Sequence, residues 1–235
     1  MNNPTELDAT HLRIAELVQN LHGRPDTDAD TVIAELAEHA AVEIPGAQYA
    51  GITLTRNGKH IETPAATHFY PMLLDKIQQR HLQGPCLTAA WEEKTIHVAN
   101  LETDDRFPLY RQDALAETPI RTIMAFQLFI AGETIGALNV YAEEPNVFGD
   151  ESRNIGLVFA AHSSVAWNSA RRDEQFRNAL ASRDMIGQAK GKIMERYGVD
   201  AVQAFELLRK LSQDSNVPLI KVATELVADT SAPAE

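Results

Sequence analysis

Two glycines and two lysines lie close together in a segment that otherwise has the composition of a helix. In residues 182–198, "SRDMIGQAKGKIMERYG", Gly187 and Gly191 are four positions apart, which places them on one face of a helix. Lys190 and Lys192 flank the second glycine. An interior glycine costs a helix about 1 kcal/mol relative to alanine. The pair therefore indicates that another backbone comes close to this helix, and the neighbouring lysines favour a phosphate backbone.

Basic residues are concentrated at the C-terminal end, although the protein as a whole is acidic. Its 235 residues include 21 Lys and Arg against 33 Asp and Glu, a formal net charge of −12, which argues against a generic nucleic-acid binder. Residues 1–170 contain 11 basic and 23 acidic side chains, whereas residues 171–235 contain 10 of each. Between positions 183 and 210, six basic side chains outnumber four acidic ones. The sequence thus indicates an acidic body and a locally basic end.

Motifs for catalysis, metal binding or membrane insertion are missing from the sequence. There is no Gly-rich phosphate loop, no G-x-S-x-G and no convergent set of carboxylates, so we predict no catalytic residues and no enzyme activity. The eight histidines have no metal-ligand spacing, and His81 and His97 are interpreted as ordinary surface or core residues. The single Cys86 excludes an internal disulfide framework and favours a reducing compartment. Without a signal peptide or a run of about 20 apolar residues, the chain is expected to be cytoplasmic and not membrane-bound.

Helical periodicity and alternating runs divide the first 150 residues into a mixture of helices and strands. Apolar stripes predict helices at residues 7–21 and 29–44 and a short one at 72–82. Asn-Gly at positions 57–58, the favoured type I′ turn, separates two alternating runs and predicts a hairpin. Two long strands fold back at positions 131–132. With a further strand at "TIHVANL", these elements predict an α+β domain with an antiparallel sheet and flanking helices.

Residues 150–197 are compatible with one long helix. Asp150 is suited to begin it. A weak seven-residue register, in which mainly apolar and small side chains alternate with His162, Arg183 and Lys190, continues on both sides of the polar stretch "ARRDEQFR". This register predicts a parallel helical connector in a homodimer. The alternative is two separate helices with a break near Arg171.

The last part of the chain predicts a small three-helix unit. Gly198 is placed to end the long helix, and Asp200 with Gln203 forms a capping-box pattern that begins the next one. Pro218 then opens a third helix. The core of the unit is expected to contain four residues: Ile193, Met194, Phe205 and Val222.

Residues 27–166 resemble a GAF domain, a sensor module for small molecules and signals. The resemblance rests on "LQGPCLTAAWEEKTIHVANLETDDRFPLY", "IRTIMAFQLFIAGETIGALNVYAEEPNVFGDE" and "IGLVFAAHSSVAW". It implies a six-stranded antiparallel sheet with a ligand pocket on one face and helices, often dimer-forming, on the other. It identifies no ligand and no cofactor, and Cys86 is more readily explained as a small buried residue than as a chromophore-binding or reactive thiol.

The C-terminal unit closely resembles the ANTAR domain, the three-helix RNA-binding module of transcription antitermination regulators. The match runs through "ALASRDMIGQAKGKIMERYGVDAVQAFELLRKLSQDSNVPLIKVATELV" almost without gaps, and it departs from the family at Val217-Pro218, where many members have a basic or polar pair. With the preceding domain, the chain resembles a GAF-ANTAR regulator. This implies binding to paired hairpins with six-nucleotide loops in a nascent leader transcript.

The resemblance and the basic pattern together give a set of candidate RNA-binding positions. Ser212 and Asn216 are equally consistent with RNA contact and with capping or local turn bonds. Tyr197 and Phe205 are expected to pack in the core, which argues against base stacking. The predicted RNA-binding residues are Arg183, Ala189, Lys190, Gly191, Lys192, Arg209, Lys210, Ser212, Asn216 and Lys221.

The complete prediction assigns four segments and one function. Residues 1–26 form an N-terminal dimerisation helix, 27–170 the GAF sensor domain, 171–228 the ANTAR RNA-binding domain and 229–235 a flexible tail. The function is signal-responsive RNA binding that promotes antitermination, by a homodimer that has RNA polymerase as a further candidate partner. The alternative is a signalling module whose C-terminal helices bind a partner protein and not RNA.

Overall fold

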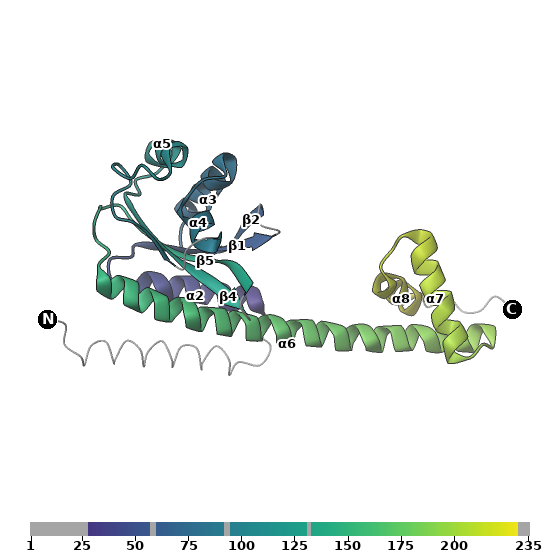
Figure 1. The fold of residues 1–235 in the computed structure, drawn as a ribbon. Coiled ribbons are helices and arrows are strands. Elements are labelled where there is room, and N and C mark those ends of the chain that lie inside the picture. Colours follow the sequence, from purple (N-terminus) through teal and green to yellow (C-terminus); the bar gives the residue numbers. More distant parts are fainter. Residues whose placement is uncertain (1–27, 57–59, 92–94, 131–132, 230–235) are drawn as a thin grey trace, which may run out of the picture. The chain divides into compact units, whose positions relative to one another are not determined.

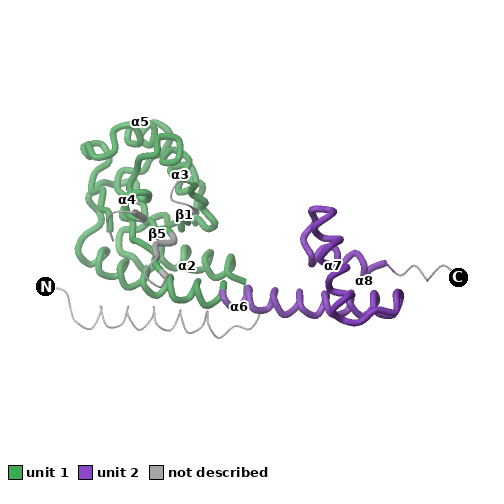
Figure 2. The backbone as a smooth tube through the Cα atoms, turned by 45° about the vertical axis from the view of Figure 1, so that its right-hand side comes forward, with its two compact units in different colours: residues 1–171 green, residues 172–235 purple. Residues whose placement is uncertain are grey.

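The computed structural model describes residues 28–229 except 57–59, 92–94 and 131–132 (Figure 1). The helix predicted at residues 7–21 lies outside the described residues, and so do both predicted turns and nearly all of the predicted tail. The chain divides into two compact units, residues 1–171 and residues 172–235 (Figure 2).

The first unit is built on one antiparallel sheet. Its strands are β1 (Tyr49–Arg56), β2 (His60–Ala66), β3 (Thr95–Val98), β4 (Thr122–Ile130) and β5 (Glu133–Ala142). Their order is β2-β1-β5-β4-β3, and every neighbouring pair is antiparallel. Among the described residues the sheet has five strands, so the sixth strand implied by the GAF resemblance is not found there.

The pairing confirms both predicted hairpins. Arg56 pairs with His60 across the first one, and Ile130 pairs with Glu133 across the second. Strand residues alternate between the two faces of a sheet. In β4, accordingly, Met124 and Phe126 belong to one core cluster whereas Ile123 belongs to another.

Helices cover both faces of this sheet (Figure 1). On one face lie α2 (Ala29–Glu43) and residues 150–171 of α6 (Asp150–Tyr197), and their shared core includes Leu36, Phe126 and Phe159. On the other face lie α3 (Phe69–His81), α4 (Pro85–Trp91) and α5 (Pro108–Glu117). The apolar core on that side includes Leu74, Ile123 and Tyr141. The predicted α+β class is confirmed.

The sequence pattern predicts α2 and α3 but not α4 and α5. Both missed helices are short, with 7 and 10 residues. Two or three helical turns are too few to show a clear periodic stripe of apolar residues. Each begins with a proline, Pro85 and Pro108 respectively. Proline at the first helical position is a common start signal, and it could have revealed both helices.

The long segment from Asp150 to Tyr197 is a single helix, α6, of 48 residues. The alternative with a break near Arg171 is therefore not what the structure shows. Gly198, with a φ of 63°, donates its N–H to the carbonyl of Met194 and ends the helix as predicted.

The second unit contains the end of α6 together with α7 (Ala201–Ser215) and α8 (Leu219–Ala228). The predicted capping box is present, because the Asp200 side chain accepts from the Gln203 N–H and the Gln203 side chain bonds the Asp200 N–H. The buried core consists of Ala189, Ile193, Ala204, Leu208, Val222 and Ala223.

Two of the four residues predicted for the core of this unit do not lie in it. Ile193 and Val222 are buried, but Met194 and Phe205 are each 37% exposed. The small side chains of Ala189 and Ala204 are fully buried in this core instead.

Candidate nucleic-acid interface

Ala189 and Lys192, both predicted to contact RNA, have roles inside the second unit. Ala189 is fully buried in the core. The Lys192 ammonium donates hydrogen bonds to the backbone carbonyls of Leu226, Val227 and Asp229, at N···O distances of 3.2, 2.7 and 3.0 Å. The last carbonyls of a helix have no partner within it, and a cation is favoured there by the helix dipole. Lys192 thus fastens the C-terminal end of α8 to α6.

Replacing Lys192 with methionine is expected to loosen α8 without changing the rest of the unit. Hydrogen bonds from a charged group contribute roughly 1.5–3 kcal/mol, so amide hydrogen exchange in the last turn of α8 should accelerate about tenfold or more. Lys210→Met is the matched control, because the Lys210 ammonium has no partner among the described residues. An exchange rate in α8 that is unchanged by Lys192→Met would contradict this role.

Ser212 and Asn216 act in the turn between α7 and α8. The Ser212 hydroxyl donates to the Val217 carbonyl at 2.6 Å. Asn216 is the C-cap of α7 in the left-handed conformation, with a φ of 53°. The structure therefore provides the local turn bonds that were one of the two interpretations of these residues.

The other predicted cations are on the surface of the unit. Within the part of the chain that the structure describes, the side chains of Arg183, Lys190, Lys210 and Lys221 form no ion pair or hydrogen bond. Arg209 pairs with Glu206 on the same helix at 2.6 Å, with both side chains more than half exposed, and such surface pairs contribute little energy. These cations are available to an anionic partner.

Two subsets of these cations are brought together by helix geometry. Arg183 and Lys190 are seven residues apart on α6 and therefore lie on one face. Arg209 and Lys210 line a shallow depression of about 660 Å³ on α7, together with Gln203 and Gln213. Because its other lining residues include two carboxylates, Glu206 and Asp214, this depression is electrostatically mixed.

Gly187 and Gly191, the two interior glycines of the last part of α6, face open space. Among the residues that the structure describes, no atom beyond the adjacent helix backbone lies within 4 Å of a Cβ built on Gly187 or on Gly191. Gly156, on the same helix, is different: its Cβ would collide with the Phe126 ring, so that glycine is required by packing. Packing within the second unit thus gives no reason for Gly187 and Gly191. Their exposed backbone is open to a partner.

Aromatic and apolar side chains are more exposed here than the sequence predicted. Tyr197 is 65% exposed and Phe205 37% exposed, which corrects the expectation that both pack in the core. Val202, Leu207 and Leu211 of α7 are exposed as well. Tyr197 is the last residue of α6. This position at the end of the helix could have indicated from the sequence that the Tyr197 side chain lies outside the core.

The first unit contains a buried polar network on the side of the sheet covered by α3. One carboxylate oxygen of Asp75 accepts hydrogen bonds from the hydroxyls of Thr53 (2.6 Å) and Thr63 (2.7 Å), and the other oxygen accepts from the Gln78 amide (2.9 Å). Burial raises the pKa of Asp75 to about 6, although these hydrogen bonds oppose the increase. Cys86 lies beside Gln78 and is buried, and burial raises the pKa of its thiol well above the ordinary value. Its burial agrees with its interpretation as a small core residue.

The described residues contain no candidate metal site and no candidate membrane-spanning helix. In the ranges that the structure describes, no three His, Cys, Asp or Glu side chains are grouped so that they could hold a metal ion. No helix in those ranges combines the length and apolar character needed to cross a bilayer.

The two units define a class of protein in which a sensor-type α+β domain precedes a small helical output domain. Comparison with family models agrees: the model for the GAF domain matches residues 26–168, and the model for the ANTAR domain matches residues 174–227. The chain belongs to the GAF-domain family and carries an ANTAR domain after its GAF domain, which confirms the predicted architecture. An ANTAR domain implies an RNA-binding antitermination regulator, and a GAF domain implies signal sensing.

Solved structures support the fold of the first unit. The GAF domain of an Acinetobacter phosphoenolpyruvate-protein phosphotransferase has a TM-score of 0.55 at 13% identity, over 74% of this chain and 99% of that one. A GAF domain of the same kind of protein from Coxiella burnetii has a TM-score of 0.55 at 15% identity, over 71% and 98%. Free methionine-R-sulfoxide reductase from Neisseria meningitidis has a TM-score of 0.54 at 13% identity, over 74% and 96%. At these identities the likeness shows the fold alone. No curated protein matches the chain significantly.

Proposed function

We propose that this protein is a cytoplasmic, signal-responsive regulator that binds hairpins with six-nucleotide loops in nascent leader transcripts and promotes antitermination. The observation that carries the proposal is the ANTAR match over residues 174–227. The GAF domain supplies the sensor, and the protein acts by binding and not by catalysis.

The RNA-contacting surface is proposed to be narrower than the predicted set of ten residues. Arg183, Lys190, Gly191, Lys210 and Lys221 have access to solvent, and they offer exposed backbone or a charge that no described residue pairs with. Arg209 joins them once a phosphate competes with its exposed partner Glu206. The remaining four, Ala189, Lys192, Ser212 and Asn216, support this surface through the contacts that they make inside the unit.

A homodimer is part of this proposal. Val165, Phe176 and Leu180 are exposed apolar residues of α6, and the spacing of four places Phe176 and Leu180 on one face of the helix. Apolar side chains on one helix face are stabilised when a second helix covers them. Two copies would also present two ANTAR domains to paired hairpins. Light scattering should show a dimer, and a strict monomer with and without RNA would remove the helical connector from the proposal.

Filter binding with the full-length protein tests RNA recognition. A leader RNA with two six-nucleotide-loop hairpins should be retained with higher affinity than an RNA of the same length and composition whose loops are scrambled. Affinity should fall as salt rises, because phosphate contacts release counterions. Equal retention of both RNAs at physiological salt would reject specific hairpin binding.

The exposed apolar side chains of α7 favour one alternative, a module that binds a partner protein such as RNA polymerase. Val202, Leu207 and Leu211 would then be buried by that partner. Replacing all three with serine should leave hairpin binding intact if RNA is the ligand of the cationic surface. Loss of regulation with normal hairpin binding would assign the α7 surface to a protein partner.

A further inference from the structure

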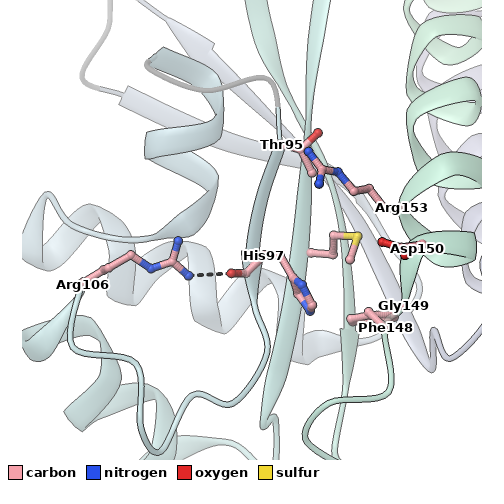
Figure 3. Close-up of a pocket in the computed structure, with 8 residues that line it drawn as sticks. Thr95, His97, Arg106, Phe148, Gly149, Asp150 and Arg153 are labelled. Carbon is pink, nitrogen blue, oxygen red and sulfur yellow. Dashed lines mark hydrogen bonds between the residues drawn. The ribbon is translucent and has the colours of Figure 1, made fainter.

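A cavity in the first unit lies at the edge strand β3, on the sheet face that is packed against α6 (Figure 3). Its volume is about 450 Å³, within the range of roughly 300–1,000 Å³ typical of small-molecule sites. The Asp75 network is on the opposite face of the sheet, so the cavity is distinct from that network. The residues that matter for its chemistry are Thr95, His97, Met124, Phe148, Asp150 and Arg153.

Three charged side chains line the cavity, Arg106, Asp150 and Arg153, and two of them are available to a ligand. Asp150 and Arg153 come from the first turn of α6, and neither side chain forms an ion pair or hydrogen bond with any described residue. Arg106 also lines the cavity, but its guanidinium is bound to the Asp104 carboxylate and to the His97 carbonyl. The cavity therefore has both charges available and a balanced total charge.

The partly buried His97 adds an unsatisfied polar atom. Nε2 of His97 is buried and has no hydrogen-bond partner among the described residues, a condition that costs free energy unless a ligand or water satisfies it. Burial lowers the pKa of His97, and the charges of Arg106 and Arg153 lower it further, so the neutral form of the ring is favoured. Two apolar side chains also lie in this lining: Phe148 is edge-on to the His97 ring at 6.4 Å between ring centroids, and Met124 is buried.

The positions of the charged and polar side chains in the cavity indicate which class of ligand fits it. Figure 3 shows the Arg153 guanidinium extending toward Thr95, with Asp150 between Arg153 and Phe148. A carboxylate would bind Arg153 and the Thr95 hydroxyl, and an ammonium group would bind Asp150. A ligand with only a negative charge would be opposed by Asp150, and a ligand with only a positive charge by Arg153. We propose that this cavity binds a free α-amino acid with an apolar side chain, which contacts Met124 and Phe148.

Isothermal titration of the full-length protein tests the proposal independently of RNA. The probes are L-leucine, L-methionine and L-phenylalanine, compared with two leucine analogues that each lack one charge: 4-methylpentanoate, which lacks the ammonium group, and 3-methylbutylamine, which lacks the carboxylate. We expect saturable binding of at least one of the three amino acids and weaker binding of both analogues than of leucine. Inorganic phosphate is included as a purely anionic probe.

Single-residue variants test whether the amino acid binds in this cavity. Arg153→Gln and Asp150→Asn should each weaken amino-acid binding about tenfold or more, whereas Glu151→Gln, in the same helical turn but outside the cavity lining, should leave it unchanged. Melting temperatures measured without ligand check that the variants are folded. The proposal is overturned if none of the three amino acids binds at millimolar concentration, if phosphate binds as tightly as they do, or if a folded Arg153→Gln protein binds like the wild type.

Discussion

Replacing Gly191 with leucine is expected to weaken hairpin binding about tenfold or more, equivalent to about 1.4 kcal/mol, while the ANTAR unit stays folded. The added side chain has room, because a Cβ at Gly191 meets no atom of the described residues within 4 Å apart from the adjacent helix backbone. Leucine is also a better helix former than glycine, which costs roughly 0.8–1 kcal/mol relative to alanine, so the melting temperature should be unchanged or higher. The loss of affinity would come from the leucine occupying the space through which an RNA backbone approaches Lys190.

Two further variants make this result interpretable. Lys190→Ala should reduce both affinity and the salt dependence of affinity, because a protein that neutralises one phosphate fewer releases about one counterion fewer on binding. Gly156→Leu is the packing control: its side chain would collide with Phe126, so this variant should lose stability. If Gly191→Leu behaves like Gly156→Leu, or dissociates the dimer while RNA binding is normal, the glycines serve contact between helices and the proposed role of Gly191 fails.

The second large effect concerns Asp75 and pH. Burial raises the pKa of this carboxyl from 3.8 to about 6 in the folded protein. The folded state therefore binds the proton more strongly than the unfolded state does, and the stabilisation this provides is fully present below pH 3.8 and is lost as pH rises through 6. A difference of about two pKa units corresponds to about 3 kcal/mol. From this group alone, the free energy of unfolding of the GAF unit should decrease by that order between about pH 4 and pH 7.

Urea unfolding at several pH values, followed by tryptophan fluorescence, measures this effect. Both tryptophans, Trp91 and Trp167, belong to the first unit, so the signal reports on that unit. The difference in unfolding free energy between the wild type and Asp75→Asn isolates the contribution of the carboxyl group. As pH rises, the free energy of unfolding of the wild type should decrease relative to that of Asp75→Asn.

Asp113 provides a control of opposite sign. Hydrogen bonds from His81 and Arg80 lower the pKa of Asp113, so its stabilising contribution is present at neutral pH and is lost as pH falls through the folded pKa. Asp113→Asn should therefore change the pH profile in the reverse direction. A profile for Asp75→Asn that is parallel to the wild type would show that the buried carboxyl does not titrate between about pH 4 and 7.

Local features of the candidate site were predictable because they depend on residues close together in the chain. The start and end of α7 illustrate this: Asp200 bonds a residue three positions away, and Ser212 bonds one five positions away. The bonds of Lys192 were not predictable, because they join residues 34 to 37 positions apart. In sequence, Lys192 has the same spacing from Gly191 as Lys190 does, and nothing local separates a structural lysine from a surface one.

The sequence by itself determined the α+β class, both hairpins, the end of α6, the start of α7 and the order of the two domains, since these follow from periodicity, turn residues and family motifs within short windows. Only the tertiary structure decided which of the basic residues are free, that Tyr197 and Phe205 are exposed, and that Gly187 and Gly191 face open space. It also decided the Asp75 network and the cavity between β3 and α6. Each of these depends on side chains from separate elements meeting in space, and the period of one helix or strand shows which face is buried but not what that face contacts.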